Sequence, residues 1–144
     1  VASPASAAPA PSAGVYAGNL CGSSSNWSTA NAGAEACVFR NGGTSSWISL
    51  TVGAADYARD GLSAKADVWV RQLDRYGNQV GSTVTFYPVI NSSGYATTRI
   101  GYPATIYKHS GVTAVRLTIR ACTYDSPTKV HHSCATQHRT LTWG

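Results

Sequence analysis

Segment 113–122, TAVRLTIRAC, places apolar and polar side chains in strict alternation. Its apolar residues are Val115, Leu117 and Ile119, and polar residues stand between them. Successive side chains of a β-strand point to opposite faces, so one face of this segment meets the core and the other meets water. The segment therefore predicts a half-buried strand, and it favours β structure for the whole chain.

Five further segments have the period-two pattern or the Thr- and Tyr-rich composition of strands: 46–52, 64–73, 82–89, 95–100 and 138–143. Turn signals rich in Gly, Asn and Ser separate them, and QLDRYGNQVGS predicts a hairpin between 64–73 and 82–89. Pro88 suits a sheet edge or a bulge. Only 51–62 leaves room for a helical turn or two. Many short strands at this spacing predict an all-β fold, a β-sandwich.

The N-terminal segment differs from the rest in composition. Residues 1–18 are rich in Ala, Pro and Ser, with prolines at Pro4, Pro9 and Pro11. Proline favours an extended backbone, and a segment this poor in apolar surface cannot offset its ordering entropy alone. We therefore expect an extended arm over 1–18 and one β-sandwich domain over 19–144.

The four cysteines are Cys21, Cys37, Cys122 and Cys134, and they permit three connectivities. Because short loops close most readily, we expect the two local disulfides 21–37 and 122–134. Disulfides indicate an oxidising compartment. The small-residue start resembles what remains after signal-peptide cleavage, so we expect a secreted, extracellular protein.

Charge and hydropathy limit the partners. The formal net charge is +5, but the basic residues are scattered without a polybasic run. No recognised nucleic-acid motif accompanies them, so we expect no nucleic-acid partner. No run of 18 apolar residues is present, so we expect no membrane span.

The sequence carries no convincing catalytic or metal-binding motif. Asp56 and Asp60 are the only close acidic pair, and capping is their ordinary role. The histidines of KVHHSC, His131 and His132, stand beside Cys134 without the spacing of a zinc site. The patterns NWS at 26–28 and NSS at 91–93 are interpreted as chance matches to the glycosylation motif. We predict a non-enzymatic protein with no cofactor and no metal.

The arm, the cysteine positions and the late strand GVTAVRLTIRAC together resemble the small adaptor subunit of the umbrella toxin particles of Streptomyces. In that family the adaptor joins a lectin-bearing subunit with a degenerate trypsin-like domain to the repeat-built ring of the large toxin subunit. The resemblance implies a connector whose arm, from Pro4 to Tyr16 and including Val15, inserts into a cleft of its partner. It supplies no catalytic residues.

Two other functions remain open from the residues themselves. A protease inhibitor would present the disulfide-closed loop CTYDSPTKVHHSC, with Lys129 as a basic specificity residue. A cell-wall or carbohydrate-binding module would use exposed aromatic rings. Trp47 and Trp69 alternate with their strands' apolar residues and are the candidates for a partner- or glycan-binding face, with Tyr87 similarly placed.

Overall fold

The computed structural model describes residues 15–18, 31–40 and 46–143. These residues form strands and, within the described ranges, no helix. The strands are β1 (Val15–Gly18), β2 (Ala32–Arg40), β3 (Trp47–Asp56), β4 (Ser63–Asp74), β5 (Gln79–Thr85), β6 (Val89–Asn91), β7 (Thr97–Ile100), β8 (Ala104–Tyr107), β9 (Val112–Asp125) and β10 (Val130–Thr142).

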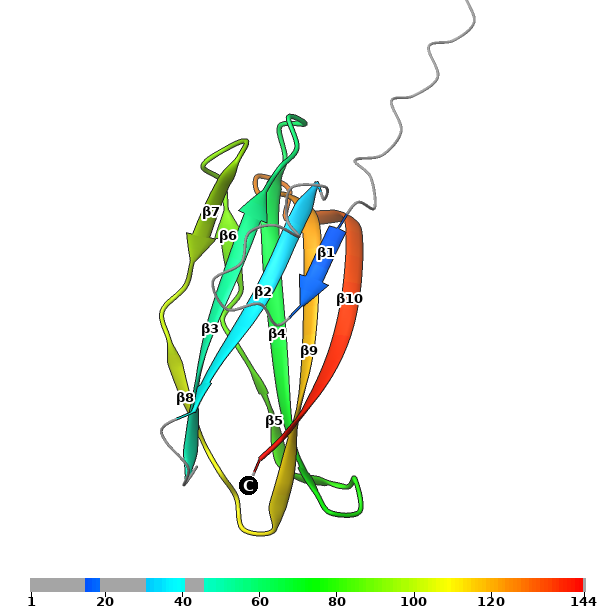
Figure 1. The fold of residues 1–144 in the computed structure, drawn as a ribbon. Helices are drawn as coiled ribbons and strands as arrows, with labels where there is room; N and C mark the ends of the chain where they lie inside the picture. The colour runs from blue at the N-terminus through cyan, green and yellow to red at the C-terminus, as the bar shows by residue number, and fades with distance from the viewer. Residues whose placement is uncertain (1–14, 19–30, 41–45, 144) are drawn as a thin grey trace, which may run out of the picture.

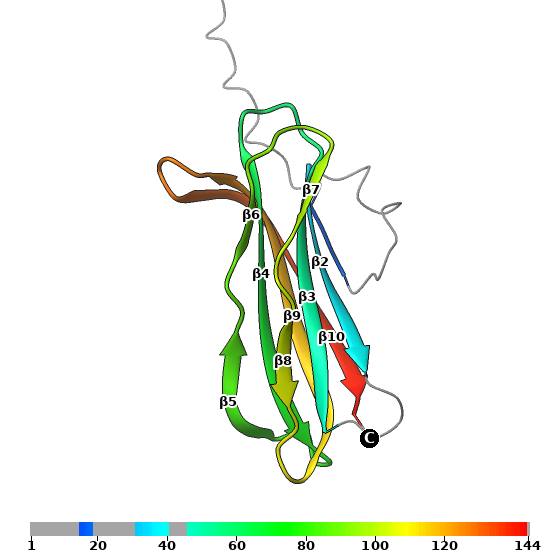
Figure 2. The same cartoon turned by 90° about the vertical axis from the view of Figure 1, so that its left-hand side faces the viewer.

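Two five-stranded sheets pack against each other, which confirms the predicted all-β sandwich (Figures 1 and 2). The first sheet has the order β1-β2-β3, and the two short strands β7 and β8 both pair with β3. The second has the order β10-β9-β4, and β5 and β6 both pair with β4. Strand β1 runs parallel to β2, and every other strand pairing among the described residues is antiparallel.

The predicted strands are found, with two corrections. The hairpin from β4 to β5 is confirmed by the register that pairs Leu73 with Gln79. Segment 82–89 is not one strand, because β5 ends at Thr85 and β6 begins at Val89. The helical turn allowed in 51–62 does not form, since β3 continues to Asp56 and the chain then bends into β4.

The core lies between the inner faces of the sheets. The predicted apolar face of 113–122 is confirmed, because Val115, Leu117 and Ile119 are each at most 1% exposed. They pack with buried residues of β2, β3, β4 and the C-terminal Trp143. Burying each large aliphatic side chain contributes roughly 1.5–3 kcal/mol relative to leaving it in water.

A disulfide between Cys122 and Cys134 joins β9 to β10, as predicted. The two residues are direct cross-strand partners with Cα atoms 4.2 Å apart. Cys37 is buried in β2, and its predicted partner Cys21 lies outside the described residues, so the 21–37 pairing stays a prediction. In the described part of the chain, no helix is long and apolar enough to cross a membrane.

Candidate functional site

One long side of the sandwich is bordered by two interrupted strands, and Figure 2 looks onto it. Strands β5 and β6 both pair with β4, and the chain leaves the sheet between them at 86–88. Strands β7 and β8 both pair with β3, and the chain leaves the sheet between them at 101–103. Both interruptions contain a Tyr-Pro pair, Tyr87-Pro88 and Tyr102-Pro103. Proline has no backbone N–H to donate, so it ends a regular ladder at an edge strand.

The two interruptions enclose a groove of about 780 Å³. Its lining is largely apolar. It includes Val52 of β3, Phe86 from the first interruption and Val89 of β6. Tyr87 and Tyr102 also line it, and they are 93% and 97% exposed. A groove of this volume is large enough for a small ligand or a short extended segment of another molecule.

Backbone hydrogen bonds fix both interruptions to the central strands. The amide of Gly101 donates to the Val52 carbonyl at 2.8 Å, and the amide of Phe86 donates to the Val68 carbonyl at 3.0 Å. Gly101 also lies directly against Val89, since a Cβ added there would be 2.8 Å from Val89 Cγ2. The groove is therefore held open by defined backbone contacts, and a side chain at position 101 would intrude on its wall.

Two buried amide side chains connect the sheets at either end of the groove. Asn91, fully buried, donates from Nδ2 to the carbonyls of Ala54 at 3.2 Å and Thr97 at 2.8 Å. At the β8 end, Gln72 donates to the Tyr107 carbonyl, and its Oε1 accepts from the amide of His109, both at 2.8 Å. A buried amide without hydrogen-bond partners would be costly. The two edges therefore have to stay at the distance at which these hydrogen bonds form.

The buried position of Asn91 also bears on the NSS pattern. Its amide nitrogen is used inside the fold, so the folded chain presents no glycan acceptor at Asn91. This agrees with the interpretation of NSS as a chance match. Asn26 of the NWS pattern lies outside the described residues.

The groove offers binding chemistry. Arg99 is the one charged residue among its described lining residues, and its guanidinium donates to the Ile90 carbonyl at 3.0 Å. The described lining contains neither a carboxylate nor a histidine, serine or cysteine. Exposed tyrosine rings can stack on sugar rings, on proline rings or on apolar side chains. Ile100, 63% exposed, extends the apolar rim.

The predicted binding residues are not brought together. Trp47 begins β3 and Trp69 lies in β4, so the two half-buried rings belong to different sheets. Val15 and Tyr16 form part of β1, at the edge of the first sheet opposite β7 and β8. Pro4, Pro9 and Pro11 lie outside the described residues. Of Trp47, Trp69 and Tyr87, only Tyr87 lines the groove.

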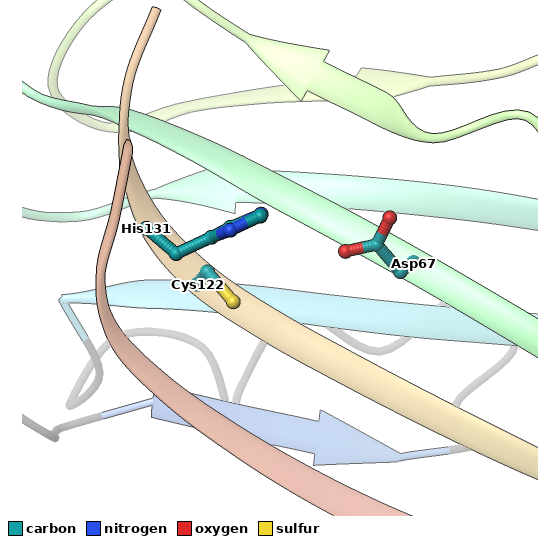
Figure 3. Close-up of side chains that lie close together, drawn as sticks. All are labelled: Asp67, Cys122 and His131. Carbon is teal, nitrogen blue, oxygen red and sulfur yellow. The ribbon is translucent and has the colours of Figure 1, made fainter. Parts of the chain in front are cut away.

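A group of potential metal ligands lies on the outer face of the second sheet (Figure 3). Ligand atoms of Asp67, Cys122 and His131 lie within 4.8 Å of one another. However, Cys122 Sγ is bonded to Cys134 and cannot act as a thiolate ligand. Lys65 Nζ lies 2.9 Å from His131 Nε2, so a cation already occupies that side of the ring. The group does not offer a usable set of ligands.

The pKa of His131 lies below its ordinary value. Partial burial is the first cause, and the positive charges of Lys65 and Arg120 add to it, against a smaller opposing effect of Asp67. The ring therefore stays neutral at physiological pH and accepts a hydrogen bond from the Lys65 ammonium. Its ring centroid lies 5.2 Å from that of Tyr124.

Each member of the acidic pair accepts a hydrogen bond from the backbone two residues further along the chain. Asp56 Oδ1 accepts from the amide of Ala58 at 3.1 Å, and Asp60 Oδ1 accepts from the amide of Leu62 at 2.9 Å. Burial raises the pKa of Asp56, partly opposed by the Ala58 hydrogen bond. Neither carboxylate lines the groove.

The proposed inhibitor loop is mostly strand. Residues 122–125 continue β9 and 130–134 belong to β10, which leaves a tight turn at 126–129. Lys129 ends that turn with φ of 59°, a left-handed conformation. A segment bound in a protease cleft is extended, so this geometry does not favour the inhibitor function.

Comparisons with protein-family models, with curated proteins and with solved structures give no match for this chain. Its function must therefore be argued from its own residues. Each Tyr-Pro pair is a sequence signal for a break in an edge strand, but the sequence does not show that the two breaks face each other.

Proposed function

We propose that this chain is a secreted, non-enzymatic protein–protein adaptor that links subunits of an extracellular antibacterial toxin complex. The observation that carries the proposal is the apolar groove between the interrupted edges, with two almost fully exposed tyrosines on its rim. Exposed tyrosine beside an apolar surface is typical of the central contacts of protein interfaces. The disulfide between Cys122 and Cys134 is compatible with secretion.

An adaptor needs two contact regions that do not overlap. The groove lies at the β7–β8 edge of the first sheet, whereas β1, where the arm joins the domain, is at its other edge. Three strand spacings separate these edges, about 14 Å of sheet. An arm that inserts into one partner therefore leaves the groove accessible to a second.

The groove suits an extended, largely uncharged segment of the second partner. Its described lining has a single charged residue, Arg99, so charge contributes little to recognition. The rings of Tyr87 and Tyr102 would hold apolar or proline side chains of such a segment. The partners suspected from the resemblance, a lectin-bearing trypsin-like subunit and a large repeat-containing toxin subunit, are the candidates for the two contacts.

Co-purification from culture supernatant tests this proposal. Deleting residues 1–14 should remove one partner, and the double variant Tyr87→Ala/Tyr102→Ala should remove the other. Tyr76→Ala is the matched control, because Tyr76 is 72% exposed in the β4–β5 turn and does not line the groove. Retention of every partner by both altered proteins would contradict the adaptor function.

The same two rings also favour a second candidate, a carbohydrate-binding module. Sugar rings stack on exposed aromatic side chains, and Tyr87 and Tyr102 are the most exposed large hydrophobic residues in the described chain. Sedimentation with insoluble cell-wall polysaccharide separates the two functions. Binding that is lost in Tyr87→Ala/Tyr102→Ala, with no protein partner affected, would favour the module over the adaptor.

A further inference from the structure

The outer face of the second sheet carries an excess of positive charge. Outward positions of β4 hold Lys65, Asp67 and Arg71, and those of β9 hold Arg116 and Arg120. The face thus has four cations and one carboxylate at these positions. This face is separate from the groove, whose lining includes none of these residues.

The charges divide into a paired and an unpaired group. Asp67 accepts from Arg120 at 2.9 Å and lies 3.7 Å from Lys65 Nζ, so the single carboxylate serves both of these cations. The two ion pairs within the described residues involve neither Arg71 nor Arg116. Asp67 is therefore occupied by Lys65 and Arg120. Among the described residues, no carboxylate lies within 4.0 Å of Arg71 or Arg116.

Arg71 and Arg116 are direct cross-strand partners. Side chains in such positions share one face with Cβ atoms roughly 5 Å apart, and like charges there are unfavourable. A bound anion removes this repulsion, and each planar guanidinium can offer two parallel N–H donors to a phosphate. The arrangement is a site that gains from an anionic ligand.

Threonine side chains occupy the row of the two arginines and the next row of the sheet. The register places Thr140 opposite Arg116, while the next row along the strands holds Thr85, Trp69, Thr118 and His138. Thr85 and Thr140 are exposed, and Thr118 is hydrogen-bonded to His138 Nδ1 at 3.0 Å. Exposed hydroxyls can hydrogen-bond to the hydroxyls of a ligand that also carries phosphate.

We propose that this face, defined by Arg71 and Arg116 with Thr85 and Thr140 beside them, binds a phosphate-bearing polyol polymer of a cell surface. Nucleic acid fits less well, because base binding relies on exposed aromatic rings. The one Phe, Tyr or Trp ring in these rows, that of Trp69, is half-buried and has the Arg120 guanidinium 5.1 Å from its centroid. The inference does not depend on the adaptor function, since it concerns a different face.

Binding of poly(glycerol phosphate) to the full chain, measured by calorimetry at several salt concentrations, tests the inference. Arg71→Gln/Arg116→Gln should weaken binding about tenfold and reduce the slope of log affinity against log salt by about 1 to 2. The control Arg59→Gln/Arg139→Gln removes the same charge, from the β3–β4 loop and from an inward-facing register position of β10. It should change affinity less than about twofold by the same electrostatic reasoning.

Four results would overturn the inference. An equal loss in both double variants would indicate attraction by net charge alone. Tighter binding of single-stranded DNA with the same number of phosphates would assign the face to nucleic acid instead. Binding of polygalacturonate with the same affinity would show that phosphate is not selected. The free energy of unfolding of Arg71→Gln/Arg116→Gln should equal or exceed that of the parent, and a lower value would contradict the repulsion on which the site is built.

Discussion

Asn91 Nδ2 donates a 3.2 Å hydrogen bond to the carbonyl oxygen of Ala54, and so connects β6 of one sheet to β3 of the other. The same nitrogen donates to Thr97. Inner faces of sandwiches usually meet through apolar contacts, whereas here a polar side chain fixes the separation of the sheets at the end of the groove.

Asn91→Ala should lower the free energy of unfolding by about 2 kcal/mol, because it leaves two backbone carbonyls without their donor in a buried setting. Chemical denaturation measures this change. Asn78→Ala, in the exposed β4–β5 turn, is the control and should change stability by less than about 0.5 kcal/mol. Equal effects of the two substitutions would show that the inter-sheet bonds contribute nothing specific.

Gly101→Ala should destabilise the protein by about 1–3 kcal/mol and reshape the groove, because the new methyl group meets Val89 Cγ2 at 2.8 Å. The backbone at Gly101 is not left-handed, so the effect arises from the contact. Val89→Ala in the same chain should recover part of the loss, which a double-mutant cycle measures. Additive effects would contradict the close contact.

Replacing both Cys122 and Cys134 by serine should lower the free energy of unfolding by about 3 kcal/mol, as expected for a loop of this length. The cysteines are 12 residues apart, and the bond holds β10 against β9 near the turn. Denaturant titrations without reductant give the comparison. An unchanged midpoint would mean that strand pairing alone holds this hairpin.

Stability should fall as the pH drops through about 6.5, in part because of His131. The pKa of His131 is lowered in the fold from its ordinary value of 6.5, so the unfolded chain binds the extra proton first as the pH falls. The groups facing the ring are Lys65, Asp67, Arg120 and Tyr124. His131→Gln should flatten the dependence of unfolding free energy on pH between about 5 and 7.5. An unchanged slope would contradict the shift.

The alternation of apolar side chains identified the central strands. In the central parts of β3, β4 and β9, at 48–54, 64–70 and 115–121, every inward position is aliphatic or Ala, so the period is visible in one sequence. Strand β2 was missed because its buried residues are largely alanine, including Ala34 and Ala36, and alanine has a low preference for strands. The first half of β10 was missed because most of its residues are exposed on both faces, which leaves no apolar period to detect.

The groove could not be predicted in the same way. It forms where residues 86–90 meet residues 99–104, and that meeting depends on the pairing of β5 and β6 with β4 and of β7 and β8 with β3. Pro88 was correctly expected at an edge. Pro103 marks the second break, but the two prolines indicate a groove only when the two breaks are known to face each other. The excess charge on the second sheet likewise depends on register, since Arg71 and Arg116 are 45 positions apart in the chain.

The two Tyr-Pro interruptions also affect how copies of this protein behave in concentrated solution. They divide that side into separate runs of regular backbone, seven residues in β5, three in β6 and four in each of β7 and β8. Short, proline-interrupted edges are poor templates for the strand addition that starts fibrils. Replacing Pro88 and Pro103 with residues that favour strands would restore a continuous edge. These prolines therefore protect the protein from aggregation as well as shaping its groove.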